Sequence, residues 1–104
     1  MVRVPRQGEI WWAEMEEKRR PVLVVTRSEA VPVLIGIVVA PVTRTSRSIP
    51  TEIHLGEAEG MSVDCAASFD NLQRIRRSAL TERVGDLGPR RLQICAAFHA
   101  LADC

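Results

Sequence analysis

Pro21-Val22-Leu23-Val24-Val25-Thr26 is a short, nearly all-apolar run rich in β-branched residues, and it predicts a strand buried on both faces. After a turn at residues 28–32, the run Val33-Leu34-Ile35-Gly36-Ile37-Val38-Val39-Ala40 predicts a longer strand that ends at residues 41–43. Gly36 inside this run indicates a bulge or a bend. Two successive aliphatic strands place a sheet at the centre of the fold.

The segments on either side of these runs also predict strands. Residues 7–15 contain Ile10, Trp11 and Trp12, which suit a half-buried pleated surface, and a charged loop follows at residues 14–19. Residues 49–55 alternate apolar and polar side chains, which predicts a half-exposed strand before a turn at 56–60. Residues 61–68 and 69–75 are plausible strands, and a short strand near 83–87 could close a barrel.

The periodicity changes at Pro89, a residue suited to the first turn of a helix. Ile94, Cys95, Phe98, Leu101 and Ala102 then fall on one side of a helical wheel. Short antiparallel strands followed by one helix predict an α+β fold, a small curled barrel with a C-terminal helix packed on it. The exposed sides of aliphatic strands favour a homodimer.

Length and composition narrow the classes of protein. A chain of 104 residues, 46% of them hydrophobic, can build one core, so residues 1–104 are expected to form a single domain. The longest apolar run, 31–42, is too short to span a membrane and is interrupted by two prolines and a glycine. The N-terminal residues do not resemble an export signal, so we expect a cytoplasmic protein without a membrane partner. Cys65, Cys95 and Cys104 are an odd number without a CxxC pair, which favours reduced thiols.

The positive charges are clustered although they nearly balance the negative ones. The chain has 14 basic and 13 acidic residues. Basic residues form three clusters, at 18–20, at 44 and 47, and at 74, 76 and 77. The second cluster lies in the segment 41–51, which contains no acidic residue. Each cluster alone is more typical of a solvated turn. If the fold brings the three together, they form a phosphate-binding face.

Three motifs occur in a characteristic order: Gly8-Glu9-Ile10-Trp11-Trp12, Arg20-Pro21-Val22-Leu23-Val24-Val25 and Val39-Ala40-Pro41-Val42-Thr43. With Asp70 opening a polar strand and the terminal helix, their order and spacing resemble the MazF/PemK (Kid) toxins of bacterial toxin–antitoxin systems. The resemblance implies a barrel similar to SH3 folds, a homodimer and an antitoxin partner, expected to be acidic. It also implies sequence-specific cleavage of single-stranded RNA without a metal or other cofactor.

The same resemblance implies roles for individual residues. Arg20, Thr43 and Asp70 take the catalytic positions, with Asp70 as a carboxylate that serves as base or RNA contact. An equally favoured alternative for Asp70 is a strand-edge carboxylate paired with one of the residues 74–77. A guanidinium with parallel donors matches the charge that builds on a phosphoryl oxygen when an RNA 2′-hydroxyl attacks its own phosphodiester. The expected products carry a 2′,3′-cyclic phosphate and a 5′-hydroxyl. The predicted RNA contacts are Arg19, Arg44, Ser46, Arg47, Asn71 and Gln73.

Some positions depart from the family's pattern. Many relatives read Asp-Gln-Ile/Val-Arg/Lys where this chain has Asp70-Asn71-Leu72-Gln73, and the loop at 14–19 is shorter than in many. The general base therefore stays open, with Glu17 and His54 as further candidates. The cleavage motif cannot be copied from a relative.

Several alternative interpretations compete with these assignments. Cys95 and His99 have a zinc-binding spacing, with Cys104 following, but four ligands are lacking and helix packing is favoured. Trp11 and Trp12 are adjacent strand residues, so their side chains face opposite ways and one of them belongs in the core. The other is expected to lie in a protein interface, an interpretation favoured over a platform on which an RNA base stacks. A gyrase poison similar to CcdB and a barrel that binds without catalysis are the alternative functions.

Overall fold

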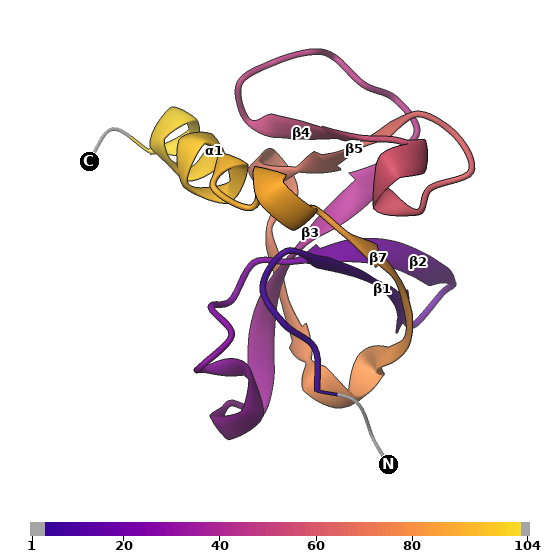
Figure 1. Cartoon of the computed structure of the whole chain (residues 1–104). Coiled ribbons are helices and arrows are strands. Elements are labelled where there is room, and N and C mark those ends of the chain that lie inside the picture. The colour runs from indigo at the N-terminus through magenta and orange to yellow at the C-terminus, as the bar shows by residue number, and fades with distance from the viewer. Residues whose placement is uncertain (1–3, 103–104) are drawn as a thin grey trace.

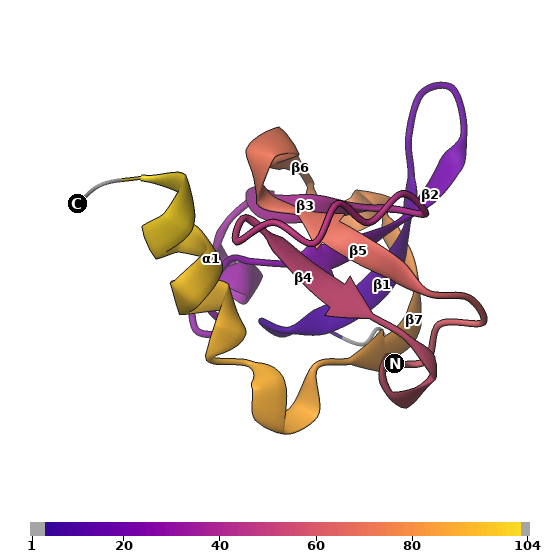
Figure 2. The same ribbon diagram turned by 90° about the horizontal axis from the view of Figure 1, so that it is seen from above.

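The computed structural model describes residues 4–102, and its seven strands form one curled antiparallel sheet (Figures 1 and 2). The order across the sheet is β4-β5-β3-β2-β1-β7, with β6 paired to β3. The strands are β1 (Glu9–Glu14), β2 (Arg19–Val24), β3 (Gly36–Thr43), β4 (Glu52–Leu55), β5 (Cys65–Ser68), β6 (Gln73–Arg76) and β7 (Leu80–Asp86). The helix is α1 (Gln93–Leu101), and short 3-10 turns are η1 (Val31–Val33), η2 (Glu57–Glu59), η3 (Phe69–Asn71), η4 (Arg77–Ala79) and η5 (Gly88–Arg90). The predicted α+β class is confirmed, with a half-barrel in place of a closed one.

The strand β3 pairs with three other strands. Along one edge Val39–Pro41 pair with β2, while along the other edge Gly36–Val39 pair with β6 and Val42–Thr43 pair with β5. Pro41, which has no N–H, lies where the second edge changes partner, so the change falls at a residue that cannot donate to a ladder. The acid-free, mainly aliphatic sequence of β3 suits a strand paired on both sides.

Apolar side chains fill both faces of the central strands. Leu23 and Ala40 belong to a core that also holds Phe69 and Ile94, whereas Val22, Val24 and Val39 belong to a second core with Trp11. The predicted burial of β2 on both faces is therefore confirmed. Helix α1 lies beside β4 and η3 (Figure 2), where Phe98 meets Phe69 edge-on with ring centroids 5.3 Å apart.

The segment at Gly60 packs its backbone directly against β7 without strand pairing. Gly60, with φ of 93°, follows η2 and lies against Gly85 of β7. A Cβ on Gly85 would lie 2.0 Å from the Glu59 carbonyl oxygen, so glycine permits this approach. Arg90 pairs with the buried Glu59 carboxylate at 3.0 Å across the same seam.

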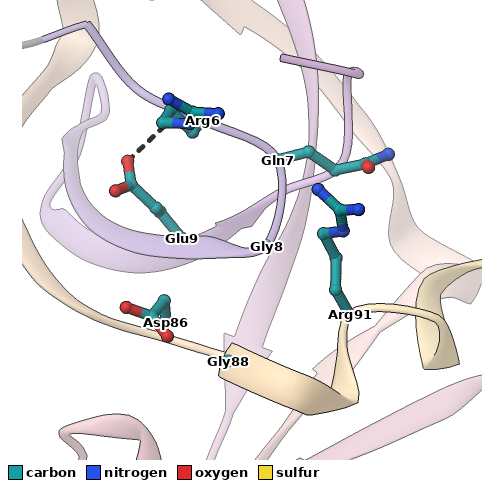
Figure 3. A pocket seen from close by; sticks show the side chains of 7 residues that line it. All are labelled: Arg6, Gln7, Gly8, Glu9, Asp86, Gly88 and Arg91. Atoms are coloured by element: carbon teal, nitrogen blue, oxygen red, sulfur yellow. Dashed lines mark hydrogen bonds between the residues drawn. The ribbon is translucent and has the colours of Figure 1, made fainter.

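Glu9 ties the first strand to the last. Its side chain is buried and accepts hydrogen bonds from the Arg6 amide at 2.9 Å, the Trp11 indole at 3.0 Å and the Arg83 Nε at 2.9 Å. Arg83 also pairs with Asp86. Figure 3 shows the small hollow beside this group, about 180 Å³, with Arg6 and Arg91 around it. Burial raises the pKa of Glu9, but the bonds from Trp11, Arg83 and Arg6 outweigh it and leave the pKa lowered.

Two details of the third strand differ from the sequence prediction. The third strand begins at Gly36 and not at Val33, because residues 31–33 form η1, and Val33 and Ile35 are exposed. Gly36 makes no bulge: the register from Gly36 to Val39 is regular, and a Cβ there would lie 2.6 Å from the Arg74 guanidinium carbon.

The remaining differences concern element ends and the helix face. The fourth strand begins at Glu52, not Ile49, and residues 61–64 and 69–71 lie outside the strands. In α1 the buried residues are Ile94 and Ala97, while Cys95 is exposed. Cys65 and Cys95 are free thiols; Cys104 lies outside the described residues. No helix in the part of the chain that the structure describes is long and apolar enough to cross a bilayer.

We predict that Gly85→Ala lowers the free energy of unfolding by roughly 2 kcal/mol or more, because the new methyl group overlaps a carbonyl oxygen that belongs to backbone. Gly56→Ala is the matched control, since its Cβ would meet the end of the Asp64 side chain at 3.2 Å. Urea unfolding of both variants measures the difference. Equal losses would show that the seam is not tightly packed.

We predict that Glu9→Gln lowers the free energy of unfolding at pH 7 by roughly 2 kcal/mol, because an amide cannot accept from all the donors around it. The lowered folded-state pKa means that unfolding takes up protons as the pH falls. The stabilisation by Glu9 is therefore fully present above the ordinary pKa of a glutamate carboxyl, and it is lost as the pH falls through the lower folded-state pKa.

Unfolding titrations between pH 7 and pH 3 should accordingly show a shallower loss of stability for Glu9→Gln than for the parent. The exposed Glu57→Gln serves as control and should follow the parent. A Glu9→Gln profile parallel to that of the parent would contradict the assignment.

Candidate functional site

Arg20 lies near the start of β2, opposite Ala13 of β1. The residue is half-buried, and its Nε donates a hydrogen bond of 3.4 Å to the Val42 carbonyl oxygen. This bond connects the beginning of β2 to the end of β3. The guanidinium is thereby held beside Thr43, and its two terminal nitrogens donate to no residue from 4 to 102.

Thr43 is the last residue of β3 and pairs with Ala66 of β5. Its hydroxyl oxygen accepts a hydrogen bond of 3.2 Å from the Thr45 amide, which fixes the turn that follows the strand. The hydroxyl hydrogen can still be donated to a ligand. The structure brings together Arg20 and Thr43, the two positions to which the resemblance gives catalytic roles.

Two hollows meet at these two residues. The first, which we call the tryptophan hollow, has a volume of about 440 Å³; the second, the amide hollow, has about 310 Å³. Arg20 and Thr43 line both. The tryptophan hollow is also lined by Trp12, Lys18, Arg19, Pro21, Val42, Arg44, Met61, Ser62, Val63 and Cys65, and the amide hollow by Pro41, Arg47, Ser68, Asn71 and Gln73.

The basic residues of the tryptophan hollow differ in their partners. Arg19 donates from Nε to Glu14 at 2.9 Å and from Nη2 to Glu82 at 2.7 Å, and its guanidinium carbon lies 4.7 Å from the centre of the Trp12 ring. The hydrogen bond to Glu82 is the main reason that the pKa of Arg19 is raised above its ordinary value. Arg44 is exposed and forms no ion pair with any residue from 4 to 102.

The amide hollow presents uncharged polar groups and one cation besides Arg20. Asn71 donates to the Ser68 hydroxyl at 3.0 Å, which orients the amide. The Arg47 amide donates to Glu52 Oε1 at 2.8 Å, and the Arg47 Nε lies 3.9 Å from Glu52 Oε2. That second oxygen is buried and has no hydrogen-bond partner among the described residues. Ser68, Asn71 and Gln73 can donate to and accept from the edge of a nucleobase.

The remaining candidates lie outside both hollows. Asp70 is exposed in η3 and accepts a hydrogen bond of 2.6 Å from the Thr51 hydroxyl. His54 is paired with Asp64 at 3.6 Å on β4, and Glu17 is exposed in the β1–β2 turn. Ser46 is exposed in the loop after β3 and lines neither hollow. None of the described residues that line the two hollows is Asp, Glu or His.

The third basic cluster does not join this site. In the β3–β6 register, Arg74 lies opposite Val38 and Arg76 lies opposite Gly36. Both positions are in the first half of β3, away from Thr43 at its end. Arg77 donates to the Val31 carbonyl oxygen at 2.8 Å and lines a separate hollow with Pro32 and Ile35. The sequence clusters at 18–20 and 44–47 therefore meet, and the convergence expected of residues 74–77 with them is wrong.

The zinc alternative has no support from the described residues. Residues 4–102 contain no group of three or more His, Cys, Asp or Glu side chains placed to hold a metal ion. Cys95 and His99 are exposed on α1, and Cys104 of that candidate set lies outside the described residues.

Sequence reasoning missed Met61, Val63 and Ser68 as site residues. Met61 and Val63 carry no reactive group and lie in an irregular segment about 40 residues from Arg20, so the chain order gives no signal for them. Trp12 was predictable in part: Trp11 is in the core, so its neighbour must face away from it. Trp12 lies in the tryptophan hollow under Arg19 and not in a bare exposed patch.

Comparison with known proteins gives a consistent set of relatives. Residues 6–100 match the family model described as PemK-like, MazF-like toxin of type II toxin-antitoxin system. A Mycobacterium tuberculosis protein named probable endoribonuclease MazF5 is 36% identical over 107 residues, covering 100% of this chain and 98% of its own.

Solved structures agree with this match. The Mycobacterium tuberculosis toxin MazF-mt6 has 32% identity and a TM-score of 0.80, covering 88% of this chain and 92% of its own. An endoribonuclease from a mycobacterial species, solved in complex with its cognate antitoxin, has the same fold at 22% identity, with a TM-score of 0.80 and coverage of 93% and 94%.

Proposed function

The chain belongs to the family of PemK-like, MazF-like toxins of type II toxin-antitoxin systems, and on this premise we propose that it is a sequence-specific, metal-independent endoribonuclease that cuts single-stranded RNA. The observation that carries the proposal is that Arg20 and Thr43 form the common edge of two hollows. A strand of RNA that places one nucleotide in each hollow brings the phosphodiester between them to this edge.

The chemistry follows from what these two side chains can donate. In the cleavage step the 2′-hydroxyl gives its proton to water, its oxygen bonds to phosphorus, and the bond from phosphorus to the 5′-oxygen breaks. The 5′-oxygen takes up a proton from water, leaving a 2′,3′-cyclic phosphate and a 5′-hydroxyl. Negative charge builds on the phosphoryl oxygens before that bond breaks. The Nε of Arg20 donates to the Val42 carbonyl oxygen, which holds the terminal nitrogens in place to stabilise this negative charge by hydrogen bonds. The Thr43 hydroxyl donates to a phosphoryl oxygen.

The other predicted residues divide between the two nucleotide sites. We assign Arg44 and Arg47 to the phosphates on either side of the scissile one, and Asn71 and Gln73 to a base edge in the amide hollow. Ser46, in the loop between those arginines, is assigned to the RNA backbone. Asp70, beside Asn71 but outside the hollow, is assigned as an RNA contact that accepts from an exocyclic amino group.

We propose further that the protein is a cytoplasmic homodimer inhibited by an acidic antitoxin. Val33 and Ile35 are 78% and 79% exposed, and apolar side chains this open are typical of surfaces that a partner covers. The cations of the hollows would attract acidic side chains as readily as phosphates. The type II system named in the family description supports the antitoxin partner. The Arg20–Thr43 edge favours the nuclease over a gyrase poison or a non-catalytic barrel.

The proposed function is tested by incubating the protein with a long single-stranded RNA in EDTA and sequencing the cut ends. Cleavage at a short common motif supports the proposal. An intact RNA at protein concentrations that bind it would support a non-catalytic barrel, and inhibition of gyrase without RNA cleavage would support the poison.

We predict that Arg20→Ala lowers the single-turnover cleavage rate by roughly 10² to 10³, the effect of removing a fixed charged donor used mainly in the transition state. Thr43→Ala should lose less, because a neutral hydroxyl contributes less than a guanidinium. Arg76→Ala removes an exposed arginine outside both hollows and should cleave at the parent rate. A folded Arg20→Ala protein as fast as the parent would refute the assignment.

We predict that a single 2′-O-methyl group on the nucleotide before the cut abolishes cleavage there, because the attacking oxygen can no longer form its bond to phosphorus. Gel analysis of matched methylated and unmodified oligonucleotides measures the effect. The same methyl group placed two nucleotides away should leave the rate nearly unchanged. Continued cleavage at the blocked position would indicate attack by water.

A further inference from the structure

The Arg19 side chain is fixed in place by three neighbours. Its guanidinium lies over the Trp12 ring at 4.7 Å, a cation-π contact, while Glu14 and Glu82 accept its hydrogen bonds in the guanidinium plane. Glu14 is itself fixed by a hydrogen bond of 2.9 Å from the Thr81 hydroxyl. Trp12 and Glu82 are partners in the β1–β7 register, and Glu14 and Arg19 in the β1–β2 register, so three strands hold this group.

This environment is unsuited to a phosphate. Two carboxylates neutralise the Arg19 guanidinium, so these three side chains together carry a net negative charge, and a phosphate at Arg19 would have to displace hydrogen bonds of 2.7 and 2.9 Å. Arg44 lines the same hollow without any ion pair to residues 4–102 and is the better phosphate ligand.

The free face of Arg19 is instead a planar surface in a partly apolar hollow. The side chain is 43% exposed, and both Arg19 and Trp12 line the tryptophan hollow. Met61 and Val63 line the same hollow from the segment before β5. The hollow of about 440 Å³ that these side chains line is large enough to hold a flat ring beside Arg19. Guanidinium planes stack on nucleobases as aromatic side chains do.

We propose that Arg19 and Trp12 form a stacking platform for an unpaired nucleobase next to the scissile phosphate, and that Arg19 is not a phosphate contact. The proposal rests on the proposed RNA cleavage and names the part of the site that binds a base by stacking. It changes the role of Arg19 from that predicted by the basic cluster at 18–20. The carboxylates of Glu14 and Glu82 are positioning groups that keep the guanidinium over the indole ring.

Phosphate contacts and base contacts differ in their salt dependence, which provides the test. Binding is measured by fluorescence anisotropy for fully 2′-O-methylated 12-mers of adenosine, cytidine and uridine, which cannot be cut, and for an abasic chain of the same length. Each series covers 50 to 200 mM KCl. Each phosphate contact on a single strand contributes roughly 0.7 to the slope of log K against log salt.

We expect Arg19→Ala to weaken binding of the best 12-mer by roughly 5- to 100-fold, the range for one stacked base, with an unchanged salt slope and little effect on the abasic chain. Arg19→Lys keeps the charge but has no planar face, so it should lose nearly as much. Arg44→Ala is the matched control: it should weaken both kinds of chain equally and lower the slope by roughly 0.7.

The outcomes separate the two proposals. An Arg19→Ala protein whose salt slope falls like that of Arg44→Ala, or an Arg19→Lys protein that binds like the parent, would overturn the stacking role while leaving RNA cleavage intact. A parent protein that binds none of these chains and cuts no RNA would overturn both. Circular dichroism checks that each variant is folded. If Arg19→Ala does not fold, Arg19→Lys alone provides the test.

Discussion

The structure depends on one strand that must satisfy three partners. β3 pairs with β2 along one edge and with β6 and then β5 along the other, so the sheet has to curl where the partners change. Pro41 lies at the change, and Thr43 lies two residues later, at the end of the strand. Because β2 runs antiparallel to β3, its first residues arrive beside the last residues of β3, and Arg20 reaches the Val42 carbonyl. The same pairing that builds the core therefore brings the two candidate catalytic groups together.

The arginines of the site are distinguished by the acids around them. Arg19 and Arg47 have carboxylate partners, whereas Arg20 is held by a backbone carbonyl oxygen and keeps its full charge for a ligand. A guanidinium held by a neutral acceptor is oriented without being neutralised. A guanidinium between two carboxylates is a rigid plane with little remaining attraction for an anion. Similar residues, one position apart in the chain, thus offer different chemistry to the same RNA.

Local patterns in the sequence were sufficient for some features and not for others. The aliphatic runs predicted β2 and most of β3, because strand formation is reflected in the period and composition of a run. Arg20 and Thr43 were indicated by the family resemblance that the ordered motifs carry, and the pairing of β2 with β3 brings them together. The prediction that the third strand begins at Val33 was wrong. Residues 33–35 are apolar like a strand, but they form the end of η1 and the exposed segment that follows it. The role of Gly36 depends on the Arg74 side chain of a strand far along the chain. The basic cluster at 74–77 failed for the same reason, since its direction is set by pairing with β3 and not by its own composition.

The pairing of β1 with β7 also has a consequence for how the protein is made. Glu9–Glu14 cannot complete their outer ladder, nor Glu9 its bond to Arg83, until β7 has left the ribosome. At 5–20 residues per second, the interval between synthesis of residue 14 and residue 86 is roughly 4 to 14 s. Contacts of such long sequence separation also form slowly after synthesis. For several seconds a nascent chain therefore has a first strand that is paired on one edge only, and Trp12 has no Glu82 opposite it. During this interval the unpaired edge is open to a partner before the folded enzyme exists.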